Sequence, residues 1–240
     1  MPLFHAVVSW YNLRVIRENL KILEERLEAA CVRSGRRREE LRLMAVSKTQ
    51  PLERIQEAYD AGLRLFGENR VFEAAEKFSG RFPEAELHLI GHIQRNKAQK
   101  AVEIAECIQS LDAVRTAKAL DSHAARIDRK ISVLIEVNTG GEDSKQGIRE
   151  EKDLHTLVDS IMACRNLELR GLMTMAPFID DTNIIRKCFR SLHAIRHKCA
   201  ESYGAGYFDV LSMGMTNDFE IAVEEGSTLV RIGTALFGAR

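Results

Sequence analysis

Apolar and polar residues follow two rhythms along this chain, one typical of helices and one typical of buried strands. Between residues 12 and 34, apolar side chains recur every three or four positions, which places them on one face of a helix. The apolar positions are Leu13, Ile16, Leu20, Leu23, Leu27 and Cys31. Ser34-Gly35 interrupts the pattern, as glycine often does after a helix. We therefore expect a leading helix over about residues 12–34.

Beyond residue 40 the pattern changes to eight short apolar runs, each of a length typical of a strand. The runs cover residues 41–46, 63–67, 86–91, 106–111, 131–137, 167–173, 207–211 and 228–232. Segments of helical character separate them, at residues 51–61, 70–78, 95–105, 113–127, 150–164, 182–202 and 217–225. Parallel strands need such crossovers, so the alternation predicts an α/β fold, a (β/α)8 TIM barrel. An open doubly wound sheet is the alternative, and only the number of strands argues against it.

The chain shows no sign of a division into separate domains. It has 240 residues, and the last apolar run ends eight residues before the C-terminus. No linker or low-complexity stretch interrupts it. We expect a single domain over residues 1–240, with the barrel core at 41–238.

Composition and charge narrow the class of protein. Lys+Arg and Asp+Glu are both 35, so the net charge is zero and nothing indicates a nucleic acid or an anionic membrane as partner. No apolar stretch reaches the roughly 18–20 residues that span a bilayer, and no signal peptide is evident. The 5 cysteines are far apart and form no CxxC motif. We expect a reduced, cytoplasmic protein with mostly buried free thiols.

The residues that directly follow the apolar runs are unusually rich in polar side chains and glycine. In a barrel of this kind these positions form the face where active sites lie. They include Lys48, Asn69, His92, Asp112, Asn138, Met175, Ser212, Met213, Gly214, Thr216, Asn217, Asp218, Gly233 and Thr234.

Two of these loops have the character of a phosphate site. Loops after the seventh and eighth strands of such barrels often bind phosphate, at a helix N-terminus. Here "SMGMTND" offers a hydroxyl, a flexible glycine and helix-capping side chains at 216–218. In "RIGTALFG", Gly233 and Thr234 offer backbone N–H groups and a hydroxyl. The alternative is that the glycines only make tight turns.

Two cationic residues stand next to these loops. Arg231 lies inside the eighth apolar run, where it must be hydrogen-bonded, either across the barrel or to a ligand. Lys48 follows the first run. A partly desolvated lysine near another cation can attack a carbonyl, although a lysine at a rim can also simply extend into water. Pyridoxal 5'-phosphate would satisfy the whole set, with an aldehyde for Lys48, a phosphate for the loops and a ring nitrogen for Arg231.

Longer motifs strengthen this interpretation. The segments "AVSKTQP", "FGENRVFEA", "HLIGHIQRNK", "IEVNTGGEDSKQGI", "RGLMTMAP" and "LSMGMTNDFEIAVEEGSTLVRIGTALFG" occur in this order between Leu41 and Gly238. With these motifs the chain closely resembles the pyridoxal phosphate homeostasis protein family. The resemblance implies a single-domain barrel similar to the N-terminal domain of alanine racemase.

The resemblance also implies roles for individual residues. Lys48 matches the lysine that carries the cofactor as a Schiff base, and Arg231 matches the arginine facing the pyridine nitrogen. Asn69 and Met175 match residues near the ring. The matches to the phosphate contacts are Ser212, Gly233 and Thr234, with help from the turn Met213-Gly214-Met215. Thr216 stands where the family often has serine and keeps the hydroxyl.

The function implied is vitamin B6 homeostasis, in which the protein acts as a carrier or regulator of the cofactor without strong catalysis. The resemblance suggests cofactor-dependent apoenzymes as partners, and closure of the barrel favours a monomer. A single-domain amino-acid racemase is the alternative, and a Schiff-base aldolase acting on a sugar phosphate is a third hypothesis. A racemase needs a second acid/base group, which in alanine racemase is a tyrosine from outside the barrel. None of Tyr11, Tyr59, Tyr203 and Tyr207 follows an apolar run.

Two further features of the sequence, a pair of histidines and a second lysine, are weaker indications of a site. His193 and His197 are four residues apart on a predicted helix, but they fall opposite its apolar side. We therefore expect no metal site there. Lys145, in the loop after the fifth run, is a candidate second residue for transient capture of the aldehyde.

Overall fold

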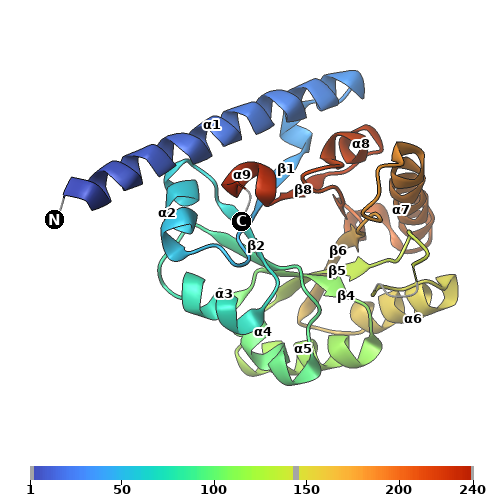
Figure 1. The fold of residues 1–240 in the computed structure, drawn as a ribbon. Coiled ribbons are helices and arrows are strands. Elements are labelled where there is room, and N and C mark those ends of the chain that lie inside the picture. Colours follow the sequence, from blue (N-terminus) through green and yellow to red (C-terminus); the bar gives the residue numbers. More distant parts are fainter. Residues whose placement is uncertain (1–2, 143–145, 239–240) are drawn as a thin grey trace.

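The computed structural model describes the backbone of residues 3–142 and 146–238, and side chains from residue 15 onward within these ranges. In this part of the chain, eight parallel strands close into a barrel in the order of the sequence. Helices surround the strands (Figure 1). The predicted (β/α)8 fold with an extra N-terminal helix is thereby confirmed, and the open sheet is excluded.

The strands agree closely with the predicted apolar runs. They are β1 Arg42–Val46, β2 Leu65–Glu68, β3 Glu86–Leu89, β4 Cys107–Leu111, β5 Ile131–Glu136, β6 Leu167–Met173, β7 Val210–Ser212 and β8 Leu229–Ile232. Parallel pairing of β1 with β8, through Met44 opposite Arg231, closes the barrel.

The helices occupy the segments between the strands. They are α1 Leu3–Arg33, α2 Leu52–Asp60, α3 Val71–Phe78, α4 Ala98–Ile104, α5 Val114–Arg126, α6 Glu151–Met162, α7 Thr182–Tyr203, α8 Phe219–Glu224 and α9 Thr234–Phe237. Short 3-10 turns lie at Arg38–Glu40, Arg95–Lys97 and Ala205–Tyr207.

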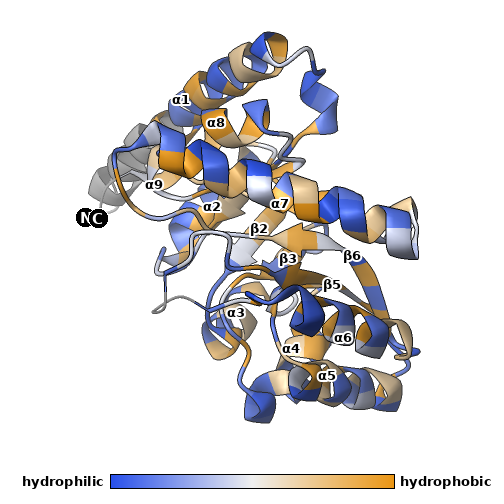
Figure 2. Ribbon diagram, turned by 90° about the vertical axis from the view of Figure 1, so that its right-hand side faces the viewer, coloured by the Kyte–Doolittle hydropathy of each residue, from blue (hydrophilic) through white to orange (hydrophobic). Residues whose placement is uncertain are grey.

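Side chains alternate between the two faces of each strand, which separates two apolar regions. Leu43 and Ala45 point outward and belong to the large core between strands and helices. Met44 and Val46 point inward and form a smaller cluster with Leu65 inside the barrel. Figure 2 shows hydrophobic residues concentrated along the strands, whereas α7 carries both hydrophobic and hydrophilic positions.

Two elements differ clearly from the prediction in their boundaries, and one short helix was not predicted. The first helix begins at Leu3 rather than near residue 12. The seventh strand is Val210–Ser212 rather than 207–211, because Ala205–Tyr207 form a 3-10 turn that leaves Tyr207 exposed. The helix α9 was not predicted, since its four residues are too few to show a periodic pattern.

The first helix supports the end of the chain from outside the barrel. Its residues Ile16, Leu23 and Leu27 are buried, as the predicted apolar face requires. Figure 1 shows α1 passing beside α8 and α9. Asn19 Nδ2 donates a hydrogen bond of 2.9 Å to the carbonyl of Leu236 in α9.

None of the helices in the described ranges combines the length and the apolar character that a membrane crossing requires.

Candidate functional site

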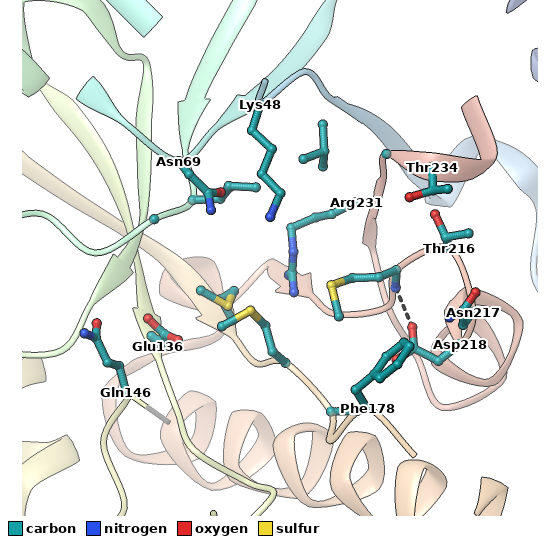
Figure 3. Close-up of a pocket in the computed structure, with 18 of the residues that line it drawn as sticks. Lys48, Asn69, Glu136, Gln146, Phe178, Thr216, Asn217, Asp218, Arg231 and Thr234 are labelled. Atoms are coloured by element: carbon teal, nitrogen blue, oxygen red, sulfur yellow. Dashed lines mark hydrogen bonds between the residues drawn. The ribbon is translucent and has the colours of Figure 1, made fainter. Parts of the chain in front are cut away.

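A cavity of about 560 Å³ opens at the carboxyl ends of the strands (Figure 3). Its volume falls within the range of roughly 300–1,000 Å³ that small-molecule sites occupy. The lining residues are Val46, Lys48, Asn69, Ile90, Gly91, His92, Glu136, Gln146, Met173, Met175, Ala176, Pro177, Phe178, Met215, Thr216, Asn217, Asp218, Arg231, Gly233 and Thr234. Every strand except β4 contributes to this lining, either from its end or through the loop that follows it, which is the arrangement expected of a barrel active site.

Lys48 enters this cavity because of the strand alternation. Met44 and Val46 point into the barrel, and Lys48 continues the same series just beyond the end of β1. Its side chain is partly buried. Figure 3 shows it directed into the space between Asn69 and Arg231.

Lys77 of α3 contacts the backbone next to Lys48. The ammonium of Lys77 donates to the carbonyl of Ser47 at 3.0 Å and to Glu68 Oε1 at 3.1 Å. The hydroxyl of Ser47 donates to the same oxygen of Glu68 at 2.8 Å. Burial raises the pKa of Glu68, while Ser47 and Lys77 oppose the shift.

Glu73 contacts the backbone on the other side of Lys48, at Thr49; together with Lys77 and Glu68 it forms a clamp around residues 47–49. Glu73 Oε1 accepts hydrogen bonds from Lys77 Nζ at 2.6 Å and from the backbone N–H of Thr49 at 2.7 Å. Burial raises its pKa, but these two donors outweigh that effect and leave the pKa below its usual value. Thr49 has a φ of 62°, a conformation that is rare outside glycine, so the hydrogen bond helps to hold an unfavourable backbone. The lysine therefore stands on a fixed loop.

Asn69 is held in place by a close backbone contact. A Cβ atom on Gly91 would lie 2.3 Å from the carbonyl oxygen of Asn69, so only glycine permits the loop after β3 to approach this closely. Both residues line the cavity.

Arg231 is both anchored in the barrel and exposed to the cavity. Its Nη1 donates to the carbonyl of Ser212 and its Nη2 to the carbonyl of Thr174, each at 2.8 Å. Burial lowers the pKa of Arg231 to about 10, and the charges of Asp218 and Glu136 oppose this shift. The guanidinium is therefore charged at neutral pH. Arg231 is thus paired within the barrel and also lines the cavity, and its contact with a ligand stays a prediction.

The loops after β7 and β8 meet at the opposite side of the cavity. The hydroxyl of Thr216 accepts a hydrogen bond from the backbone N–H of Ala235 at 3.3 Å, which ties the two loops together. The amide of Thr234 is the first of α9, so it has no partner within that helix. Thr216, Asn217, Gly233 and Thr234 thus present hydroxyl, amide and backbone groups to the cavity.

Asp218 was one of the predicted helix caps, and its side chain does not act as one. It precedes α8, but its carboxylate accepts from the backbone N–H of Met215 at 2.5 Å instead. Burial raises its pKa, against the effect of this hydrogen bond. The carboxylate therefore stabilises the loop rather than the helix.

Three residues predicted as cofactor contacts do not line the cavity. Ser212 is fully buried inside the barrel, where its hydroxyl lies 2.6 Å from Gln109 Oε1 and 2.6 Å from Arg231 Nη1. Met213 packs in the hydrophobic core. Gly214 forms the turn at a φ of 96°, and a Cβ there would lie 2.6 Å from Cβ of Ala222. In this structure these three residues lie behind the cavity wall, and their contact with a cofactor stays a prediction. The other six, which are Lys48, Asn69, Met175, Arg231, Gly233 and Thr234, lie together around the cavity.

Glu136 is the main polar group of the cavity that the sequence analysis missed. It is the last residue of β5 and is buried. Burial raises its pKa to about 7, with a further rise from the charge of Asp112 and an opposing effect of Arg231. Arg231 was identified as a candidate because it is a charged residue within an apolar run. Glu136 stands in the same way within the apolar run 131–137, so it could have been identified by the same signal.

A second acidic group lies close by. The ring of His92, at the cavity, is 3.6 Å from Asp112. Lys145, the candidate second capture residue, lies outside the described residues.

Comparison with known proteins identifies the family. Residues 12–240 match the family model "Alanine racemase, N-terminal domain". A pyridoxal phosphate homeostasis protein of Aquifex aeolicus is 39% identical over 224 residues, covering 93% of this chain and 97% of the relative. One from Vibrio cholerae is 40% identical over 233 residues, covering 95% and 98%.

The chain belongs to the pyridoxal phosphate homeostasis protein family.

Solved structures agree with this assignment and with the fold. A structure described as an unknown protein from Bifidobacterium adolescentis has a TM-score of 0.88 at 34% identity, over 95% of this chain and 96% of its own. PipY of Synechococcus elongatus, a structure with pyridoxal phosphate bound, has a TM-score of 0.78 at 34% identity, over 90% and 99%. An alanine racemase of Clostridium difficile shares only the fold, at 13% identity and a TM-score of 0.74 over 57% of its length. The resemblance seen in the sequence motifs is thereby confirmed.

Proposed function

We propose that this protein binds pyridoxal 5'-phosphate as a Schiff base on Lys48 and acts in vitamin B6 homeostasis as a carrier or regulator of the cofactor. One observation carries the proposal: Lys48, Arg231 and the loops after β7 and β8 line the same cavity. The names of the relatives and the bound ligand of PipY support it.

The residues of the cavity fit the chemical groups of this cofactor. Lys48 supplies an amine for the aldehyde, with loss of one water when the C=N bond forms. Thr216, Gly233 and Thr234 supply hydroxyl and backbone donors suited to a phosphate. Asn69 and Met175 line the space between and would contact the ring.

Arg231 favours binding over strong catalysis. When bound, pyridoxal phosphate supplies an electron sink whose strength depends on protonation of its ring nitrogen. A charged guanidinium facing that nitrogen disfavours the proton, because two positive charges would then be adjacent. The ring would remain a weak electron sink, which suits a protein that holds the cofactor.

The surroundings of the cavity offer little support for the racemase alternative. Among the described side chains, Tyr59, Tyr203 and Tyr207 do not line the cavity. Tyr203 instead pairs with His155 on the outside of the barrel, at 2.8 Å. Glu136 is the one titratable carboxyl in the described lining that comes from a strand, and it lies on β5. We expect the loaded protein to exchange the α-proton of amino acids with deuterated water no faster than free cofactor does. A useful turnover would instead make the protein a racemase.

The partners of the protein follow from this role. We propose cofactor-dependent apoenzymes as recipients and a cytoplasmic location. We expect a monomer, since closure of the barrel leaves no free sheet edge for association.

Absorbance of the loaded protein tests the proposal. We expect a visible band in the wild type that Lys48→Ala loses and Lys100→Ala, on the exposed side of α4, keeps. Borohydride reduction followed by mass spectrometry should place the cofactor mass on the Lys48 peptide. A wild type that takes up no cofactor would contradict the proposal. Trapping of a sugar phosphate instead would indicate an aldolase.

A further inference from the structure

A row of polar side chains crosses the inside of the barrel beneath the cavity. The interior of such barrels is usually filled by branched apolar side chains. Here His88 of β3, Gln109 of β4, Ser212 of β7 and Arg231 of β8 all point inward and are buried. Burying polar groups costs free energy unless each is hydrogen-bonded, so the contacts among them decide whether the row is stable.

Each member of the row contacts the next. Arg231 Nη1 lies 2.6 Å from the hydroxyl of Ser212, which lies 2.6 Å from Gln109 Oε1. Gln109 Nε2 lies 2.8 Å from Nδ1 of His88, whose Nε2 lies 2.7 Å from Glu86 Oε1. The row therefore runs without a break from the floor of the cavity to β3, and its bond from Ser212 to Gln109 joins β7 and β4, which are not neighbours.

The chemistry of its two ends fixes the direction of every hydrogen bond. Arg231 can only donate, so Ser212 accepts from it and gives its own proton to Gln109 Oε1. The amide of Gln109 must then turn its NH2 toward His88, whose Nδ1 accepts. The proton of the imidazole is left on Nε2, where it faces the carboxylate of Glu86.

Glu86, at the far end of the row, is ionised and accepts the hydrogen bond from His88. The hydrogen bond from His88 lowers the pKa of Glu86 to about 2, with a contribution from Arg42, against the effect of burial. Arg42 Nη1 also donates to Glu86 Oε1 at 3.3 Å. Glu86 is thus ionised at neutral pH and accepts only.

We infer that Glu86, His88 and Gln109 are positioning residues that orient the hydroxyl of Ser212 and thereby hold the guanidinium of Arg231 against the ring nitrogen of bound pyridoxal phosphate. The inference rests on the proposed function. It explains why polar groups occupy a region where apolar side chains would fill the same space without needing partners. The groups that face Arg231 in the cavity are Glu136, Asp218 and Lys48, and none of them belongs to the row.

Gln109→Leu tests the inference, because it keeps a similar volume and removes both hydrogen bonds at the centre of the row. The control is Leu134→Ala, which loosens the same interior without removing a hydrogen bond of the row. The probe is pyridoxal phosphate labelled with ¹⁵N in the ring, whose chemical shift reports protonation of the ring nitrogen. We expect Gln109→Leu to raise the pH at which this nitrogen is protonated. It should also weaken cofactor binding about tenfold, because the Ser212 hydroxyl loses its orientation and with it the charge-assisted hydrogen bond from Arg231. Leu134→Ala should leave the ¹⁵N titration unchanged.

Two further variants separate the row from general packing. Gln109→Glu should move the ¹⁵N titration back toward that of the wild type, since its carboxyl can still accept the hydroxyl proton of Ser212. Ser212→Ala should shift it in the same direction as Gln109→Leu, and the double variant should add little, because both changes break one row. Additive shifts, or a folded Gln109→Leu with the wild-type titration, would overturn the inference. If Gln109→Leu does not fold, the ¹⁵N titrations of Gln109→Glu and Ser212→Ala decide the question.

A measurement on the unliganded protein tests the hydrogen bonds of the row separately from the proposed binding of the cofactor. In the unliganded protein, ¹⁵N NMR of the imidazoles should show His88 with its proton on Nε2, and a proton on Nδ1 would overturn the row itself. A wild type that shows this tautomer and takes up no cofactor would overturn the proposed function, and with it the role of the row toward the ring.

Discussion

At the scale of the residue, Glu136 links the cavity to the stability of the fold. Its pKa rises from the ordinary 4.5 to about 7, chiefly because it is buried. The folded state therefore binds this proton more tightly than the unfolded state does. The resulting stability is complete below about pH 4.5 and is lost as the pH rises to about 7. The shift corresponds to about 3 kcal/mol at most.

Glu136→Gln should remove this pH dependence. In urea unfolding of the unliganded protein, we expect equal stability of variant and wild type near pH 4.5. At pH 8 the variant should be the more stable, by up to about 3 kcal/mol. Glu201→Gln, at an exposed position of α7, is the control and should follow the wild type. Parallel curves for Glu136→Gln and wild type would show that this carboxyl does not titrate in the proposed range.

Lys77 acts on Lys48 through the backbone. Lys77→Met would leave Glu68 buried without its cation and would free the carbonyl of Ser47. We expect a loss of about 3 kcal/mol in the free energy of unfolding and slower attachment of the cofactor to Lys48. Lys100→Met, which breaks an exposed pair with Glu103, should cost less than about 1 kcal/mol. If Lys77→Met were as stable as Lys100→Met and attached the cofactor as fast, the proposed role of Lys77 in holding the backbone at Lys48 would be refuted.

At the scale of the element, the turns after β7 and β8 contain glycines with different tasks. Gly214 has a φ of 96° and no room for a Cβ beside Ala222. Gly233 has a φ of −110°, and a Cβ there would lie 3.5 Å from the carbonyl oxygen of Val46, which is an ordinary contact. Gly214 therefore shapes the fold, whereas Gly233 lines the cavity.

Alanine at each position should separate these tasks. We expect Gly214→Ala to lower the free energy of unfolding by about 2 kcal/mol or more, through strain and the clash. Gly233→Ala should change stability by less than about 1 kcal/mol and weaken cofactor binding, since the methyl group would narrow the phosphate side of the cavity. Urea unfolding and a cofactor titration of both variants would test this. The reverse pattern would assign the glycines the opposite roles.

The sequence allowed the order of the strands to be predicted because each buried strand is an unbroken apolar run, and it placed Lys48 and Arg231 by counting those runs. The error at β7 shows the limit. With a strand at 207–211, Ser212 would lie in the loop beside the phosphate. In the structure Ser212 is the last residue of the strand and points into the barrel. A shift of one residue reverses the side a strand residue faces, and the three-residue β7 carries too little pattern to set its own boundary.

The polar row was missed for a related reason. His88 and Gln109 lie inside apolar runs, where a single polar residue gives no information about its partners. The contact that joins the two halves of the row, from Ser212 to Gln109, spans 103 positions in the chain, and the contact from Gln109 to His88 spans 21. Only the closed barrel brings them together.

At the scale of the whole molecule, the cavity depends on the helix α1, whose described side chains do not line it. The short helices α8 and α9 follow the two loops that we propose bind the phosphate, and α1 packs against both helices from outside. Arg26 of α1 lies 4.6 Å from the ring centroid of Phe219 and 3.0 Å from Glu220. Helices of this length have little stability of their own, so their position is set by what they pack against.

Leu27→Ala in α1 should therefore weaken binding as well as folding. Leu27 is completely buried, and its truncation should cost about 2–5 kcal/mol. The control is Leu157→Ala in α6, which is equally buried and on a helix that does not carry these loops. We expect a similar loss of stability in both variants, but faster amide exchange in α8 and α9 and weaker cofactor binding only in Leu27→Ala. Hydrogen-exchange mass spectrometry and a cofactor titration would measure this. Equal binding by two equally destabilised variants would show that the barrel holds these loops without α1.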